Sequence, residues 1–306
     1  MSFNVVYTAD VHGNETQYSK LVDYAIKIRA NSVIIGGDIA PKSNSTIADT
    51  NKKRPVVSKA NLIDIQRFFL EERLPHFLRP LKEQSPKTKV FLMMGNDDCS
   101  SNLDVLARHD GDLYNVIHGK RFPLSRHVDV VGYSCVPITP FGIKDWEKFD
   151  LSDVPSKLRA AYSHRKETNY RLTGWKSTES GLVPFKFSDD VETKDSVQRD
   201  LSTGVFAETG QRTIYVMHTP PNDTNLDQIE NHRHVGSFAV KLFIEKMQPY
   251  MTLHGHIHET VGVSGKFGER IGSSLCFSPG NDNLGKDLAL LVFDAHDLRS
   301  VERRII

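Results

Sequence analysis

Phe3-Asn4-Val5-Val6-Tyr7-Thr8-Ala9-Asp10-Val11-His12 is a mainly apolar run near the N-terminus that ends in two polar side chains. Apolar residues recur at helical spacing over 15–30, and the next apolar run, Ser32-Val33-Ile34-Ile35-Gly36, leads into Gly37-Asp38. A strand, a helix and a second strand in this order predict a parallel strand pair that the helix covers. The sequence therefore indicates an α/β fold whose first two strands each lead into a carboxylate.

The alternation of strands and helices continues along the chain. A helical stretch is expected from Leu62 to Leu70, and Pro75 should end or kink it because proline has no backbone N–H. The other predicted elements are strand 89–94, a short helix near 102–109, strands near 113–118 and 127–136, strand 212–217, helix 236–248, strand 250–254, and a final strand pair at 287–293 and 299–305. We interpret residues 1–306 as a single domain.

The segment 137–210 departs from this alternation. It contains prolines and many charges, with little periodicity apart from a helix predicted near 188–201. A loop of this length inside a domain is usually functional or mobile. We interpret it as a long insertion over one face of the domain, and we expect it to hold the determinants of substrate identity.

Aromatic residues of this insertion allow two interpretations. They could stack on a nucleobase, or they could anchor a long loop to the core, which is the commoner role of such side chains. The residues concerned are Trp146, Phe149, Tyr162, Trp175 and Phe185.

Composition narrows the function classes. A net charge of +1 provides no basic field for long nucleic acids, so a nuclease is the less favoured kind of enzyme. Three cysteines are an odd number without paired spacing, which favours a reducing compartment over a disulfide framework. No run approaches the roughly 18 apolar residues of a membrane span, and the N-terminus resembles no secretion signal. We expect a cytoplasmic protein.

Polar side chains follow five of the predicted strands. Burying such groups without partners costs roughly several kcal/mol, so their repeated placement at strand ends suggests that they converge on a metal. The groups are Asp10-Val11-His12, Gly37-Asp38, Gly95-Asn96-Asp97-Asp98, His218, and His254-Gly255-His256-Ile257-His258.

These side chains suit the chemistry of phosphoester hydrolysis. Two divalent cations roughly 3.5–4 Å apart lower the pKa of a bridging water and clamp the phosphoryl oxygens. Asp38 is placed to bridge such a pair, and Gly255 permits a close backbone approach beside His256 and His258. Imidazole, carboxylate and amide ligands suit Mn, Fe, Zn or Co.

The ordered set of motifs resembles the calcineurin-like metallophosphoesterase superfamily from Asp10 to His258. This resemblance implies a four-layer fold, a central β-sandwich flanked by helices, with two metal ions at the carboxyl ends of the strands. It also implies that Asp38 bridges the two ions. One ion would be held by Asp10, His12 and His258, and the other by Asn96, His218 and His256.

A nearer resemblance is carried by His218-Thr219-Pro220-Pro221, Thr224-Asn225-Leu226-Asp227 and His234-Val235-Gly236-Ser237, together with Gln248-Pro249 and His254–Glu259. These motifs are similar to a prokaryotic subgroup often called cyclic-nucleotide-phosphodiesterase-like.

Asp97 departs from the family pattern. The family usually has a histidine here, which contacts the phosphate and protonates the leaving group, whereas an ionised carboxylate only accepts hydrogen bonds. Asp97, assisted by Asp98, is one candidate acid, and His254, His232 or His234 are others. Asp98 has two further interpretations, as a cap of the helix near 102–109 or as a residue that supports the ligands. We expect slow hydrolysis of esters with poor leaving groups.

We therefore predict a phosphoesterase that hydrolyses a phosphodiester or phosphomonoester through a dinuclear metal centre and a bridging hydroxide. The partner would be a small or nucleotide-like phosphoester, without nucleic acid or membrane. The alternative is a catalytically weak metal-binding scaffold or sensor, which Asp97 favours. Seven intact ligand positions favour the enzyme.

Overall fold

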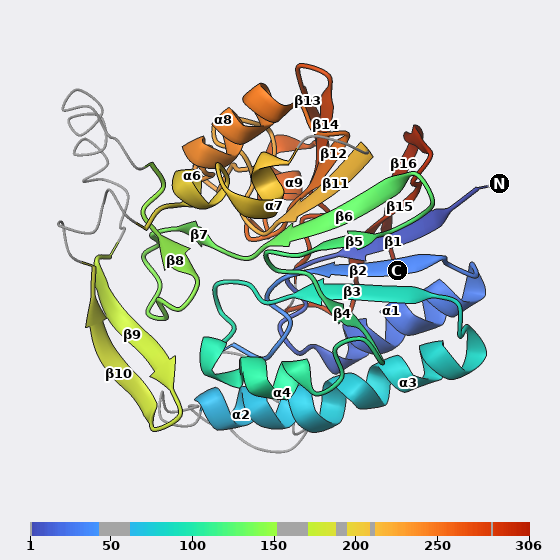
Figure 1. Ribbon diagram of the computed structural model, residues 1–306, viewed down its shortest axis with the longest axis horizontal. Coiled ribbons are helices and arrows are strands. Elements are labelled where there is room, and N and C mark those ends of the chain that lie inside the picture. The colour runs from blue at the N-terminus through green and yellow to red at the C-terminus, as the bar shows by residue number, and fades with distance from the viewer. Residues whose placement is uncertain (1, 43–61, 152–170, 188–194, 209–211, 283) are drawn as a thin grey trace.

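Two mixed β-sheets pack against each other, and helices cover their outer faces (Figure 1). The structure is a computed structural model that describes residues 2–42, 62–151, 171–187, 195–208, 212–282 and 284–306. This architecture of two sheets flanked by helices confirms the fold predicted from the sequence.

The first sheet has the strand order β16-β15-β1-β2-β3-β4. Strands β1, β2, β3 and β4 are parallel, whereas β15 pairs antiparallel with β1 and with β16. Its strands are β1 (Asn4–Thr8), β2 (Ser32–Gly36), β3 (Lys89–Met93), β4 (Asn115–Val116), β15 (Ala289–Asp294) and β16 (Asp297–Ile305).

The second sheet has the strand order β13-β14-β12-β11-β6-β5. Its central strands β14, β12, β11 and β6 are parallel, and an antiparallel strand closes each edge. Its strands are β5 (Arg121–Pro123), β6 (Val128–Tyr133), β11 (Arg212–Met217), β12 (Met251–Leu253), β13 (Gly268–Ile271) and β14 (Ser274–Phe277).

Helices cover the outer face of each sheet. The first sheet carries α1 (Glu15–Lys27), α2 (Leu62–Phe68), the π-helical turn η2 (Phe69–Arg73), α3 (Leu74–Gln84), the 3-10 turn η3 (Ser100–Asn102) and α4 (Leu103–Ala107) (Figure 1). The second sheet carries α6 (Val197–Asp200), α7 (Gly204–Ala207) and α8 (Phe238–Met247), and α9 (Thr260–Ser264) follows β12.

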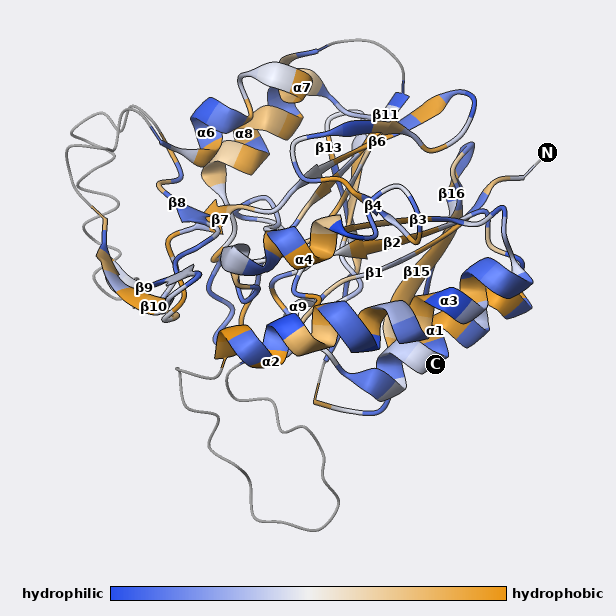
Figure 2. Cartoon of the chain, turned by 60° about the horizontal axis from the view of Figure 1, so that its bottom comes forward, coloured by the Kyte–Doolittle hydropathy of each residue, from blue (hydrophilic) through white to orange (hydrophobic). Residues whose placement is uncertain are grey.

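Side chains along a strand point alternately to its two faces, so each sheet packs on the other sheet with one face and on helices with the other. Val5 and Tyr7 belong to the cluster between the sheets, whereas Val6 packs in the outer cluster with residues of the covering helices such as Leu21 and Leu78. Because both faces are covered, the central strands are largely apolar, while the helices alternate apolar and polar faces (Figure 2).

Several predicted elements differ from the structure. Pro75 does not end a helix. It lies at the start of α3, which directly follows the π-helical turn η2. The strand predicted over 127–136 breaks after Tyr133, and a short strand β7 (Val136–Pro137) pairs with β8 (Glu147–Lys148). Of the helix predicted near 188–201, residues 188–194 lie outside the described part, and α6 covers only Val197–Asp200.

The segment 137–210 contains a β-hairpin that the sequence did not predict. Strands β9 (Thr173–Thr178) and β10 (Gly181–Lys186) pair antiparallel at one end of the molecule (Figure 1). Most of their residues are partly or fully exposed, so the apolar alternation that marks a half-buried strand is missing from their sequence. None of the helices in the described ranges is long and apolar enough to cross a membrane.

Candidate metal centre

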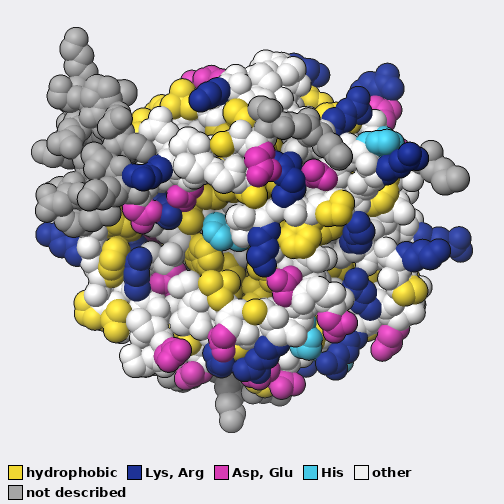
Figure 3. All heavy atoms as spheres, viewed as in Figure 1, with side chains coloured by type: hydrophobic (Ala, Val, Ile, Leu, Met, Phe, Trp, Pro, Cys, Tyr) yellow, Lys and Arg dark blue, Asp and Glu magenta, His cyan; other side chains and the backbone are white. Residues whose placement is uncertain are grey.

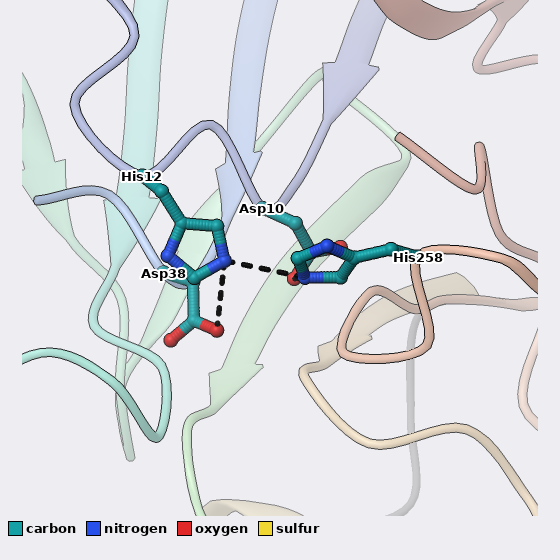
Figure 4. A group of neighbouring side chains, drawn as sticks. All are labelled: Asp10, His12, Asp38 and His258. Atoms are coloured by element: carbon teal, nitrogen blue, oxygen red, sulfur yellow. Dashed lines mark hydrogen bonds and ion pairs between the residues drawn. The ribbon is translucent and has the colours of Figure 1, made fainter. Parts of the chain in front are cut away.

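The polar groups that follow the strands meet at one edge of the sandwich. Residues after β1 and β2 of the first sheet and after β12 of the second form a cluster of four side chains, Asp10, His12, Asp38 and His258 (Figure 4). One ligand atom from each lies within 4.8 Å of all the others. Asp10, His12 and Asp38 are buried and His258 is partly exposed. The cluster is of a kind that holds a divalent metal ion.

Two ring nitrogens face each other in this cluster. Nε2 of His12 lies 3.2 Å from Nε2 of His258, and 3.5 Å from Oδ2 of Asp38. Burial lowers the pKa of His12 well below its ordinary value, so its ring is neutral. A neutral imidazole whose Nε2 faces a second imidazole and a carboxylate is well placed to bind a cation.

A second group of predicted residues adjoins the first. Nε2 of His218 lies 3.3 Å from Oδ2 of Asp38 and 3.1 Å from Oδ1 of Asn96, and its ring lies 5.4 Å from that of His256. Nδ1 of His218 contacts the carbonyl oxygen of Gly36 at 2.9 Å, which orients the ring. Asp38 therefore stands between His12 and His218, and the structure brings all seven predicted ligand positions together.

The backbone is strained where these side chains turn inward. Asp10, His12, Asp38 and His256 all have positive φ, at 58°, 48°, 52° and 68°. Non-glycine residues rarely adopt this left-handed conformation, and such residues concentrate at functional sites. The conformation explains how residues two apart in Asp-x-His can both face the cluster.

Glycines allow the loops to approach each other. A Cβ at Gly255 would lie 2.7 Å from Oδ2 of Asp10, and a Cβ at Gly95 would lie 2.7 Å from Nε2 of His218. Any larger residue would displace one of the clustered side chains. The close approach expected at Gly255 is thus observed.

Asp98 lies beside the cluster but its oxygens are used by the backbone. Oδ2 accepts hydrogen bonds from the N–H groups of Ile39 at 3.0 Å and Gly95 at 2.8 Å, and Oδ1 accepts one from Ala40 at 2.8 Å. These bonds tie the loop after β2 to the loop after β3. The geometry favours the supporting interpretation of Asp98 over direct chemistry.

Asp97 lies at the opening of the site. Its side chain is 25% exposed, and Oδ2 lies 3.9 Å from Nδ1 of His12, while its N–H donates to Oδ1 of Asp38 at 2.8 Å. Burial, and then the charge of Asp38, raise the pKa of Asp97 to about 8. Burial opposes ionisation of Asp38 too, but His218 and His12 outweigh it and hold the pKa of Asp38 below its ordinary value.

The alternative proton donors lie elsewhere. Nδ1 of His254 is 3.0 Å from the carbonyl oxygens of Met217 and Thr219, and Nε2 is 2.7 Å from Oγ1 of Thr252, so both nitrogens are engaged. Nδ1 of His234 is 2.7 Å from Oδ1 of Asp227. Neither of these histidines, nor His232, lines the cavity at the cluster.

That cavity has a volume of about 480 Å³. Its lining joins cluster residues to side chains of the insertion and comprises Asp38, Lys42, Leu62, Asn96, Asp97, Phe141, Gly142, Ile143, Arg171, Trp175, His256, His258 and Glu259. Trp175 is the one lining residue among the five aromatic residues singled out from the sequence, of which Tyr162 lies outside the described part.

Sequence reasoning missed two contributors. Nδ2 of Asn281 donates to the carbonyl oxygen of Asp10 at 3.2 Å and to Oε1 of Gln17 at 2.9 Å, which holds the loop after β1. Phe141 reaches the cavity and meets His256 edge-on, with ring centroids 6.5 Å apart. No motif marks either residue.

Comparisons with known proteins agree with this geometry. The family model described as calcineurin-like phosphoesterase matches residues 3–260. The comparison with curated proteins returned no match.

Two of the similar solved structures, the first two described here, share the fold at low sequence identity. One crystal structure is 16% identical with a TM-score of 0.57, and the match covers 100% of this chain and 99% of the other. The protein TT1561 of Thermus thermophilus is 15% identical with a TM-score of 0.52, over 100% and 99% of the two chains. A dimetal phosphatase from Danio rerio is 12% identical with a TM-score of 0.47, over 96% and 93%.

Proposed function

The chain belongs to the calcineurin-like phosphoesterase family, whose members are hydrolases that act on ester bonds, and from this premise we propose that it hydrolyses a small or nucleotide-like phosphoester with two divalent metal ions. The convergence of seven ligand-type side chains from five loops carries the proposal. The proposal covers phosphodiesters and phosphomonoesters, and relative rates on the two kinds of ester decide between them.

The residues divide into two ligand groups. Asp10, His12 and His258 would hold one ion, and Asn96, His218 and His256 the other. Asp38 would contact both, because its Oδ2 lies 3.5 Å from Nε2 of His12 and 3.3 Å from Nε2 of His218. When bound, such ions lower the pKa of water and neutralise phosphoryl charge. Manganese, iron, zinc and cobalt all suit this ligand set.

The chain's own groups orient these side chains. The carbonyl oxygen of Gly36 accepts from Nδ1 of His218, which directs Nε2 towards Asp38. The Asp10 carboxylate accepts the N–H of His256 at 2.9 Å, and thereby fixes the loop after β12 against the loop after β1. Asp97 lines the cavity beside the ligands and would hold a proton for the leaving group, while Asp98 supports the loops.

The remaining features support a single enzyme with an insertion. We propose that residues 1–306 form one domain and that residues of 137–210 cover the cavity. The cysteines Cys99, Cys135 and Cys276 are unpaired and buried, which supports a reducing, cytoplasmic environment. Lys and Arg side chains are scattered among acidic ones on the face shown in Figure 3, an arrangement that does not favour a nucleic-acid substrate.

Metal-resolved hydrolysis tests the proposal. The purified protein is stripped of metal and assayed on bis-nitrophenyl phosphate and nitrophenyl phosphate with Mn, Fe, Zn, Co or Mg, while bound metal is quantified. Turnover that returns with two metals per chain is the expected result. Failure to bind any metal would overturn the proposal.

The second candidate is a metal-binding scaffold or sensor. It is favoured by Asp97, which puts a carboxylate at the opening where the family resemblance leads us to expect a histidine. Two bound metals without turnover on a broad panel of phosphoesters would establish this alternative.

A further inference from the structure

We propose that the cavity binds phosphoesters whose ester group carries a flat aromatic ring, with Phe141 and Trp175 as the faces that recognise the ring. This inference rests on the proposed phosphoesterase function and specifies its substrate class. It also assigns a task to the insertion, from which both aromatic residues come.

The lining of the cavity combines two kinds of side chain. The candidate metal ligands Asp38, Asn96, His256 and His258 mark where the phosphoryl group would lie. Phe141, Ile143 and Trp175 add aromatic and apolar surface, and the remaining charged lining residues are Lys42, Asp97, Arg171 and Glu259. A phosphoester that spans the cavity therefore places its phosphorus among the ligands and its organic group among aromatic and apolar side chains.

Phe141 is a solvent-exposed apolar side chain beside a candidate metal ligand. It is 50% exposed, and its ring stands edge-on to that of His256, with centroids 6.5 Å apart. Large apolar side chains beside a polar site gain free energy when a ligand covers them. Aromatic side chains offer stacking surface to a nucleobase or another flat ring.

The aromatic wall is held in place by its backbone. The N–H of Trp175 donates to the carbonyl oxygen of Gly142 at 2.8 Å, and the N–H of Lys144 donates to the carbonyl oxygen of Trp175 at 2.9 Å. Gly174 lies so close to Gly142 and Lys144 that a Cβ there would clash with both. The segment with Phe141 and the strand with Trp175 thus form one unit.

This unit is also fastened to the loop that carries Asn96 and Asp97. The Asp145 carboxylate accepts hydrogen bonds from the N–H of Ser100 and the N–H of Ser177, both at 2.8 Å. Nε1 of Trp146 donates to the carbonyl oxygen of Asp98 at 2.9 Å. The wall therefore stands at a fixed distance from the candidate metal ligands, as a preorganised recognition surface requires.

The first test compares two esters that lose the same leaving group. Methyl nitrophenyl phosphate and the nitrophenyl ester of thymidine 5′-monophosphate both release nitrophenolate, and only the group that stays on phosphorus differs. We expect kcat/KM to be at least about tenfold higher for the thymidine ester, because the stacking of one base on an aromatic side chain accounts for about this factor. Phe141→Ala and Trp175→Ala should each lower this preference severalfold without loss of bound metal.

A matched control is Phe68→Ala. Phe68 is similarly exposed, at 57%, but does not line the cavity, so this variant should keep the wild-type preference. A wild-type preference near one overturns the inference. A preference that both cavity variants retain also overturns it.

A second readout does not need turnover. The chain has two tryptophans, and Trp175 is the one that lines the cavity. In the wild-type protein we expect thymidine 5′-monophosphate to quench the part of the fluorescence that Trp175→Phe removes, at a concentration at least about tenfold below that of methyl phosphate. Equal affinities for the two would contradict the inference. Quenching without hydrolysis of either ester would sustain it and refute the phosphoesterase proposal alone.

Discussion

Nε2 of His12 lies 3.2 Å from Nε2 of His258, although 246 positions separate the two residues in the chain. The first follows β1 of one sheet and the second follows β12 of the other, so their contact depends on the packing of the two sheets. Two ring nitrogens at this distance, beside two buried carboxylates, form a site whose charges a cation would balance.

Asp38→Asn should remove metal binding and turnover together. Oδ2 of Asp38 approaches Nε2 of both His12 and His218, so its charge serves both ligand groups. We expect fewer than two metals per chain and a loss of activity greater than about a hundredfold. Mutating residues that only orient metal ligands already lowers metal affinity or activity by about 10–100-fold. Metal analysis and kinetics on the same preparation check this.

The control for that substitution is Asp104→Asn, which alters an exposed carboxylate paired with Arg67. It should retain both metals and full activity. Loss of activity in Asp38→Asn with both metals still bound would count against the bridging role.

Asp97→His should widen the range of leaving groups. The carboxylate lies at the opening of the site, where related proteins are expected to have a histidine that protonates the leaving group. A positioned general acid contributes about 10²–10⁴-fold, and mainly when the leaving group is poor. We expect the variant to accelerate hydrolysis of alkyl esters more than that of nitrophenyl esters.

The matched control is Asp97→Asn, which has the same size but no titratable proton. Wild-type protein should show a marked preference for nitrophenyl esters over alkyl esters. Comparable wild-type rates on both kinds of ester would refute the inference that Asp97, in place of a histidine, slows the hydrolysis of esters with poor leaving groups.

Asp98→Asn should destabilise the protein and weaken metal binding. The carboxylate accepts three backbone N–H groups, from Ile39, Ala40 and Gly95, and an amide would turn its own NH2 group towards at least one of them. We expect the free energy of unfolding to fall by about 2–4 kcal/mol. Urea unfolding measures this loss, and unchanged stability would refute the supporting role.

Stability should decrease below neutral pH because of His118. Burial, the largest influence, lowers the pKa of this ring to about 4 from an ordinary 6.5. At a pH between these two pKa values the unfolded chain binds a proton that the folded protein does not. The stability that comes from the neutral ring is therefore fully present above about pH 6.5 and is lost as the pH falls. At pH 5 the loss should be about 2 kcal/mol.

His118→Asn tests this effect. Nδ1 of His118 accepts the N–H of Ser134 at 2.9 Å, and the amide oxygen of asparagine can take its place. The variant will lose the ring contact with Trp146, so its stability at pH 7 will be lower, but its pH dependence should be flatter. An unchanged difference in unfolding free energy between pH 7 and pH 5 would refute the prediction.

Local sequence patterns were sufficient for the layers of the fold. The apolar run before Asp10 and the one before Gly37-Asp38 are long enough to identify strands, because a strand covered on both faces is apolar at every position. The β9–β10 hairpin escaped prediction for the opposite reason: its residues are largely exposed and carry no such pattern. Likewise, the π-helical turn before Pro75 depends on how helices pack and has no signature in composition.

The candidate ligands and their order could be identified from the chain alone, because metal-binding residue types follow apolar strands at short, regular spacing. Their grouping required the packed sheets: His12 meets His258, and His218 meets Asn96, across loops far apart in sequence. The role of Asp98 also emerged only in three dimensions, since a carboxylate that accepts backbone N–H groups looks in sequence like one that takes part in chemistry. The recognition wall of Phe141 and Trp175 belongs to the same class, because side chains without a fixed spacing acquire a common surface only when the chain has folded.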